Sequence, residues 1–213
     1  MCIRDSHTIL AQRVKEGIRD AGGVPLEFPV HQIQETLKRP TAGLDRNLQY
    51  LSLVEILHGY PMDGVVLTIG CDKTPGAALM AAATVNIPAI ALSGGPMLDG
   101  WHQGRLAGSG TIVWEARRML AGGEIDQRQF MEMVAASSTS WGHCSTMGTA
   151  LSMNSLVEAV GMSLTGCAAI PGPHRERAQM AYYSGVRIVE MVKANQRPSD
   201  VMTKKAFENA VMV

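Results

Sequence analysis

A short apolar run, a glycine turn and an alanine-rich stretch constrain the fold of this chain more than any other feature. Residues 63–69 are apolar and β-branched, which is typical of a buried strand, whereas residues 77–85 are small and helix-forming. Between them stands Gly70-Cys71-Asp72-Lys73, so the pattern predicts a strand, a tight turn and a helix. Open α/β sheets bind ligands at the carboxyl ends of parallel strands, where this turn would lie.

Cys71, Asp72 and Lys73 place a soft thiol, a hard carboxylate and an amine side by side at this predicted strand end. Two interpretations are open from these residues alone. Either the three side chains form a functional site, or the thiol fills a strand end. In the second case the Asp–Lys pair is an exposed ion pair, which contributes little stability.

Predicted strands alternate with predicted helices along the rest of the chain, which indicates a layered α/β domain with a mostly parallel sheet. The apolar periodicity and the glycine and proline stops predict strands at 24–30, 63–69, 87–92 and 167–170. They predict helices at 7–21, 44–57, 77–85, 111–120, 126–136, 147–160, 174–195 and from 203 onward, and a loop at 98–109.

The composition excludes several classes of partner. The 213 residues carry no net formal charge, so neither a nucleic acid nor an anionic membrane surface would find a basic attractor. No apolar run is long enough to span a bilayer, and no signal peptide is visible. The four cysteines are widely scattered, which favours reduced thiols and a cytoplasmic location.

Two cysteines stand in similar sequence surroundings. Cys71 and Cys144 each follow a glycine turn ahead of a predicted helix, where backbone N–H groups would stabilise a thiolate. Thiolates select iron–sulfur clusters, zinc or copper(I). The spacing leaves open a shared metal site, a zinc site that also uses His143, and two unconnected buried thiols. Cys167, in an apolar run, is interpreted as a small hydrophobic residue.

Four motifs resemble those of the dihydroxy-acid and phosphogluconate dehydratase family, in unbroken order over residues 7–213. The motifs are Gly70-Cys71-Asp72-Lys73, Ser93-Gly94-Gly95-Pro96-Met97, Gly142-His143-Cys144-Ser145-Thr146-Met147-Gly148-Thr149-Ala150 and Pro198-Ser199-Asp200. The segments 39–41 and 44–47 and the run 147–150 are most similar to the sugar-acid branch of the family, which acts on arabinonate, xylonate and similar aldonates. The same-class alternative is a dihydroxy-acid dehydratase of branched-chain amino-acid synthesis.

The resemblance implies a 2Fe-2S cluster held by three cysteines, two of which match Cys71 and Cys144. It also implies a Mg²⁺ ion held by Glu35, Asp72 and a carbamylated Lys73. Such an enzyme is a hydro-lyase that converts a small-molecule aldonate into a 2-keto-3-deoxy acid, and it works as a dimer or tetramer. A carbamate supplies the oxygen ligands that Mg²⁺ prefers.

The two ends of the chain depart from the family pattern. Residues 1–6 read as a non-native leader, which puts Cys2 in doubt as the first cluster ligand. Residues 7–213 are expected to be an incomplete N-terminal α/β domain, because residues 206–213 lack a capping or polar tail. The family's catalytic serine base belongs to a C-terminal β-barrel-like domain. No catalytic base is therefore assigned here, and the chain alone is expected to be inactive.

Overall fold

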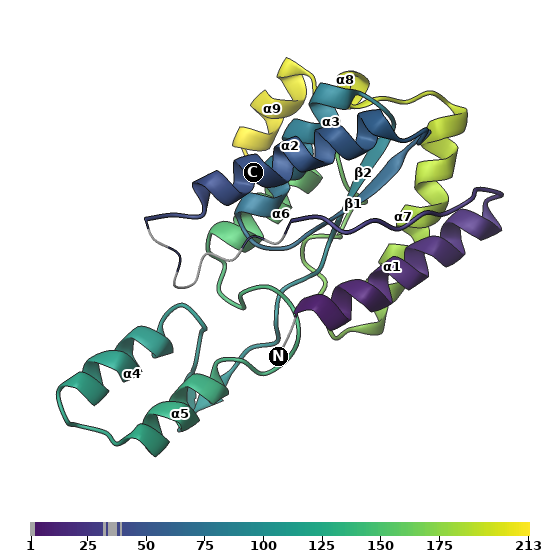
Figure 1. Ribbon diagram of the computed structural model, residues 1–213. Coiled ribbons are helices and arrows are strands. Elements are labelled where there is room, and N and C mark those ends of the chain that lie inside the picture. The colour runs from purple at the N-terminus through teal and green to yellow at the C-terminus, as the bar shows by residue number, and fades with distance from the viewer. Residues whose placement is uncertain (1–2, 32, 34–37, 39) are drawn as a thin grey trace.

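The computed structural model describes residues 3–31, 33, 38 and 40–213, with side chains described from residue 7 onward within these ranges (Figure 1). Two positions singled out by the sequence, Cys2 and Glu35, lie outside the described residues. None of the helices in the described ranges is both long and apolar enough to span a bilayer.

A parallel pair of strands lies at the centre of the fold (Figure 1). Strand β1 (Val65–Ile69) and strand β2 (Ala89–Ser93) are joined through helix α3 (Lys73–Val85), as the central strand–turn–helix pattern predicts. Ile69 lies opposite Ser93, so the carboxyl ends of both strands meet at one edge of the sheet. The turn after β1 and the glycine-rich turn after β2 are therefore neighbours.

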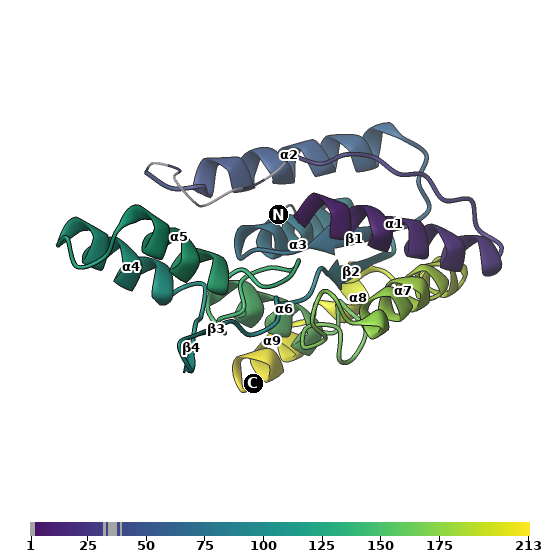
Figure 2. The same cartoon turned by 90° about the horizontal axis from the view of Figure 1, so that it is seen from below.

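Helices cover both faces of this sheet, which confirms the layered α/β architecture. Helices α2 (Gly43–Gly59) and α3 lie on one face, and Figure 2 shows α2 as an outer layer over α3. Helices α1 (Ile3–Asp20) and α7 (Arg175–Lys193) pack against each other and against the other face. The buried residues at the first face include Leu53, Leu57, Val65, Leu67, Ala78, Ala81 and Val157, and those at the second include Leu10, Val14, Ile90, Leu92, Ala181 and Ile188.

Two glycines let α1 and α7 approach each other closely. A Cβ atom at Gly17 would lie 2.1 Å from the carbonyl oxygen of Tyr182, and one at Gly185 would lie 2.2 Å from that of Val14. Both distances are far below van der Waals contact, so neither position accommodates a side chain without separating the helices. The close packing of α1 against α7 fixes the helical layer on this face of the sheet.

The segment between β2 and α6 (Thr149–Ala159) forms an arm that extends from the body (Figure 1). Its helices α4 (Ile112–Ala121) and α5 (Gln127–Ala136) confirm the two helices predicted there. The predicted loop at 98–109 contains a small antiparallel pair, β3 (Trp101–His102) with β4 (Arg105–Leu106). The C-terminal part contains α8 (Pro198–Val201) and α9 (Lys204–Val211).

Two predicted strands are wrong. Residues 24–30 pair with no strand in the described part of the chain, and Val24 and Leu26 are 88% and 75% exposed. Residues 167–170 form turns, because the side chain of Glu158 accepts the backbone N–H groups of Gly166 and Ala168 at 2.6 and 2.8 Å. These amides therefore have a side-chain partner in place of a neighbouring strand.

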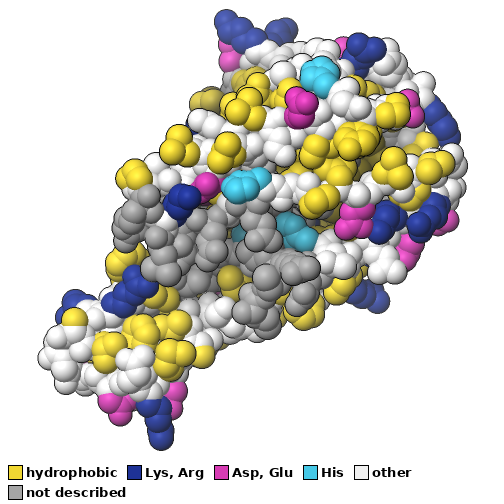
Figure 3. All heavy atoms as spheres, viewed as in Figure 1, with side chains coloured by type: hydrophobic (Ala, Val, Ile, Leu, Met, Phe, Trp, Pro, Cys, Tyr) yellow, Lys and Arg dark blue, Asp and Glu magenta, His cyan; other side chains and the backbone are white. Residues whose placement is uncertain are grey.

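The outer face of α2 is apolar. Leu44, Leu48 and Leu51 are each more than half exposed, and Figure 3 shows hydrophobic side chains gathered on this side of the molecule. Leu53 and Leu57 of the same helix are buried in the core that α2 shares with α3 and β1. The helix is therefore apolar on its outer and inner sides, which blurs the one-sided periodicity of an ordinary surface helix.

Candidate metal centre

The turn after β1 is held by a threonine of the following helix. The Oγ1 atom of Thr74 accepts the backbone N–H of Gly70 at 2.9 Å and donates to the carbonyl of Cys71 at 2.9 Å. Because hydroxyl groups both donate and accept, this one residue satisfies both sides of the turn. The backbone that carries Cys71 and Asp72 is thereby fixed at the start of α3.

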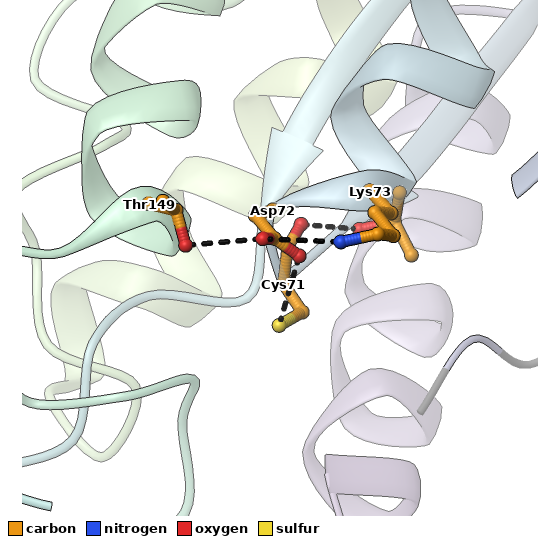
Figure 4. Close-up of polar contacts among 5 residues, drawn as sticks. Cys71, Asp72, Lys73 and Thr149 are labelled. Atoms are coloured by element: carbon orange, nitrogen blue, oxygen red, sulfur yellow. Dashed lines mark hydrogen bonds and ion pairs between the residues drawn. The ribbon is translucent and has the colours of Figure 1, made fainter. Parts of the chain in front are cut away.

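Cys71, Asp72 and Lys73 meet at this turn (Figure 4). The Sγ atom of Cys71 lies 3.6 Å from Oδ1 of Asp72, and Nζ of Lys73 lies 3.5 Å from Oδ2. The side chains of Asp72 and Lys73 are each 20% exposed, so both are largely shielded while remaining reachable by a small ligand. Thr149 of α6 donates its hydroxyl to Oδ2 of Asp72 at 3.0 Å.

The second cysteine follows a segment that is tied to the turn after β2. The backbone N–H of His143 donates to the carbonyl of Gly95 at 2.8 Å, and Met97 donates back to the carbonyl of His143 at 2.9 Å. The thiol of Cys144 lies 2.7 Å from the hydroxyl of Ser109. The segment carrying Cys144 is therefore anchored to the turn after β2, at the edge of the sheet where both strands end. It leads directly into α6.

Helix α6 connects the turn that carries Cys71 with the segment that carries Cys144. Asn154 is 1% exposed and donates its side-chain amide to the carbonyl of Gly70 at 2.8 Å and to that of Ala150 at 2.7 Å. Together with the bond from Thr149 to Asp72, this fixes the first turn and a half of α6 against the turn after β1.

Burial shifts the pKa of two groups in the site. It raises the pKa of the Cys71 thiol, and the Asp72 carboxylate raises this pKa further, whereas the backbone N–H of Asp72 and the charge of Lys73 lower it. Because the net shift is upward, a metal would have to displace the proton. Burial also lowers the pKa of His143 to about 4, with smaller contributions from the charges of Arg177 and His7. His143 is therefore neutral at physiological pH.

A layer of buried polar groups supports the turn after β2. Arg177 is 1% exposed and donates to the carbonyl oxygens of Ser93 and Ile170 and to the sulfur of Cys167. Within the described part of the chain, Nε of Arg177 and Nε2 of His7 and His143 are buried without a hydrogen-bond partner. This arginine is a structural cation that fastens the turn from inside the protein.

The donor atoms present fit the implied cofactors in chemical type. Cys71 and Cys144 are free half-buried thiols, the ligands that iron–sulfur clusters use, and Asp72 offers the oxygen atoms that Mg²⁺ prefers. Glu35 lies outside the described residues. The residues that the structure describes contain no group of three or more His, Cys, Asp or Glu side chains close enough to hold a metal ion. That finding gives no support to the zinc alternative of Cys71, Cys144 and His143.

The sequence motifs do not indicate the supporting residues. Thr149 lies in one of the motifs without a role of its own, and no motif assigns a role to Thr74, Ser109 or Asn154. The role of Thr74 is nevertheless predictable from the sequence, because a threonine just inside a helix after a turn commonly hydrogen-bonds to the nearby backbone. Nothing in the sequence indicates the partners of Ser109, Thr149 and Asn154, because these lie 35, 77 and 84 residues away.

Comparison with known proteins places this chain in a family. The sequence model of the family described as dihydroxy-acid/6-phosphogluconate dehydratase N-terminal matches residues 3–213. A D-xylonate dehydratase of Caulobacter vibrioides is 64% identical over 96% of this chain, and an L-arabinonate dehydratase of Rhizobium leguminosarum is 50% identical over 95%. A dihydroxy-acid dehydratase of Caldanaerobacter subterraneus is 39% identical over 94%.

These matches cover 34%, 35% and 37% of the respective relatives, so the chain spans about a third of their length. The family model and the relatives are matched along nearly the whole chain, in agreement with the motifs around Cys71 and Cys144. The chain belongs to the dihydroxy-acid/6-phosphogluconate dehydratase family and corresponds to its N-terminal region.

Proposed function

We propose that the whole protein to which this chain belongs is a hydro-lyase that dehydrates a sugar acid to a 2-keto-3-deoxy acid. One structural observation carries the proposal: Cys71, Asp72 and Lys73 share a turn at the carboxyl end of β1, and α6, which follows Cys144, bonds to that turn. The branch is supported by identity, which is 64% to a D-xylonate dehydratase and 39% to a dihydroxy-acid dehydratase.

In this proposal Cys71 and Cys144 hold a 2Fe-2S cluster, and Glu35, Asp72 and Lys73 as its carbamate hold Mg²⁺. When bound, the cluster would supply a Lewis acid for the departing hydroxyl, and Mg²⁺ would bind substrate oxygen atoms and so acidify the neighbouring C–H group. Lys73 suits the ligand role because its side chain is largely shielded, and burial beside a cation favours the neutral amine that reacts with CO₂.

The chain's own residues then hold the metal ligands in place and form part of the substrate site. Asp72 presents a carboxylate at the N-cap of α3, and Asn154 and Thr74 fix the backbone beneath it. A Cβ atom at Gly94 would lie 2.9 Å from Nε2 of His7, and one at Gly95 would lie 2.4 Å from the carbonyl oxygen of Ile170, so these glycines allow close packing at the strand ends, where a polyhydroxy acid would lie. The proton acceptor is assigned to the serine of the C-terminal domain that the family resemblance implies. We also infer a homo-oligomer, as the family resemblance implies, and a cytoplasmic location, in keeping with the free thiols at Cys71, Cys144 and Cys167.

The test is anaerobic purification of the whole protein, followed by iron and acid-labile sulfide analysis and assays on two substrate panels. Turnover of aldonates with Mg²⁺ supports the proposal, whereas turnover of branched dihydroxy acids alone would assign the other branch. The variants C71S and C144S are expected to lose iron, sulfide and activity. The matched control C167S, at a fully buried position against Arg177, is expected to keep all three. Zinc in place of iron and sulfide would overturn the cofactor assignment.

A further inference from the structure

Thr149 reaches across the site from a different helix. It is the first residue of α6, and its Oγ1 atom donates to Oδ2 of Asp72 at 3.0 Å, although 77 residues separate the two in sequence (Figure 4). The proposed metal ligands of this chain come from other segments, and Thr149 is not one of them.

The two oxygen atoms of Asp72 have different surroundings. Oδ1 faces the thiol of Cys71 at 3.6 Å, whereas Oδ2 accepts from Thr149 at 3.0 Å and lies 3.5 Å from Nζ of Lys73. The contact with Lys73 is long for a hydrogen bond, and it needs an ammonium group. A carbamate at Lys73 would carry negative charge and could not serve as that donor. The hydroxyl of Thr149 is neutral, so its bond to Asp72 persists in either state of Lys73.

Thr149 itself is exposed, but the backbone that carries it is fixed. Ala150, its neighbour, is 4% exposed, and Asn154, just over one turn further along α6, bonds to the carbonyl of Gly70 at 2.8 Å. A β-branched side chain also has few rotamers in a helix. The hydroxyl therefore meets the carboxylate as part of two rigid elements, α6 and the start of α3.

We propose that Thr149 is a positioning residue of the Mg²⁺ site, which orients Asp72 by holding Oδ2 and so presents the carboxylate to the ion. This inference rests on the proposed function, because it takes Asp72 as a Mg²⁺ ligand. Hydrogen bonds that orient ligating carboxylates typically matter by 10–100-fold in metal affinity. The role is distinct from catalysis, since Thr149 acts through Asp72.

The experiment measures the dissociation constant for Mg²⁺ by calorimetry on the whole protein after chelator treatment. T149V keeps the shape of the side chain but removes the hydroxyl, and it is expected to raise the Mg²⁺ Kd by about 10–100-fold. T149S keeps the hydroxyl and is expected to restore the wild-type Kd. The matched control is T84V, which removes a threonine hydroxyl of α3 that bonds Met80 and Tyr50 away from the site. It is expected to leave the Kd unchanged.

The outcomes separate this inference from the proposed function. A wild-type Kd in T149V, together with weakened binding in D72N, overturns the positioning role and leaves the metal site standing. Wild-type protein that binds no Mg²⁺, or D72N that binds as tightly as wild type, overturns the metal site and this inference with it. Circular dichroism and the melting temperature monitor folding. If T149V does not fold, T149A replaces it, with the same loss of affinity expected.

Discussion

Asn154 and Gly70 are 84 residues apart in sequence, yet the side-chain amide of Asn154 donates to the carbonyl of Gly70 at 2.8 Å. The same amide donates to the carbonyl of Ala150 at 2.7 Å, and the side chain is 1% exposed. One buried residue therefore sets the position of α6 relative to the turn that carries Cys71 and Asp72.

Replacing Asn154 tests how much this bond contributes. N154A leaves the Gly70 carbonyl without its side-chain donor and opens a cavity, so the free energy of unfolding is expected to fall by about 2 kcal/mol. Equilibrium urea unfolding of the 213-residue chain measures it. The control N209A changes an exposed asparagine of α9 and should shift stability by less than about 0.5 kcal/mol. Equal effects of the two variants would contradict the structural role of Asn154.

His143 makes stability depend on pH. It is 2% exposed and its pKa is lowered to about 4, against 6.5 for an unperturbed histidine. The unfolded chain binds a proton here first as the pH falls, so the neutral ring favours the folded state in full above about pH 6.5. That contribution is expected to disappear progressively between pH 6.5 and 4, by about 3 kcal/mol in total.

Urea unfolding between pH 7.5 and 4 checks this expectation. H143Q cannot titrate and should flatten the pH dependence, although His7, whose pKa burial also lowers, keeps part of the slope. The control H58Q, at an exposed histidine of α2, should keep the full slope. A wild-type slope in H143Q would show that this ring does not control acid stability.

Gly142 allows the segment ahead of Cys144 to pass close to the turn after β2. Its φ is +136°, and a Cβ atom there would lie 2.6 Å from the backbone carbon of Pro96. G142A is expected to cost more than about 3 kcal/mol, since backbone strain and a backbone clash add. G104A, at φ +75° with no atom within 4 Å of the added Cβ, has the strain without the clash and should cost about 1 kcal/mol. Melting curves that shift equally would refute the close contact at Gly142.

Replacing Lys73 tests whether this residue is an ion-pair partner of Asp72 or a metal ligand. K73R keeps a cation beside Asp72 but cannot form a carbamate, so the whole protein is expected to lose at least about a hundredfold in activity with Mg²⁺. Carbon-13 NMR after exposure to labelled bicarbonate should show a carbamate signal in the wild type that is absent from K73R. The control K204R, at an exposed lysine of α9, should retain activity. Full activity in K73R would leave only the ion-pair role.

Local patterns in the sequence determined most of the fold. The β-branched run at 63–69, the small residues at 77–85 and the apolar periodicity at 111–120, 126–136 and 174–195 correspond to β1, α3, α4, α5 and α7. These patterns suffice because the buried positions of a strand or an amphipathic helix can be recognised from the spacing of its own apolar residues. They fail at 24–30 and 167–170, because a strand requires a neighbouring chain to pair with, and short apolar runs do not specify one.

The sequence also determined that Cys71, Asp72 and Lys73 share one turn, since they are adjacent. The tertiary structure alone decided what holds them. Thr149 and Asn154 reach Asp72 and Gly70 only because hydrophobic packing places α6 beside the start of α3. A hydroxyl or amide has many possible partners, and which one it meets depends on helix positions set by the core as a whole.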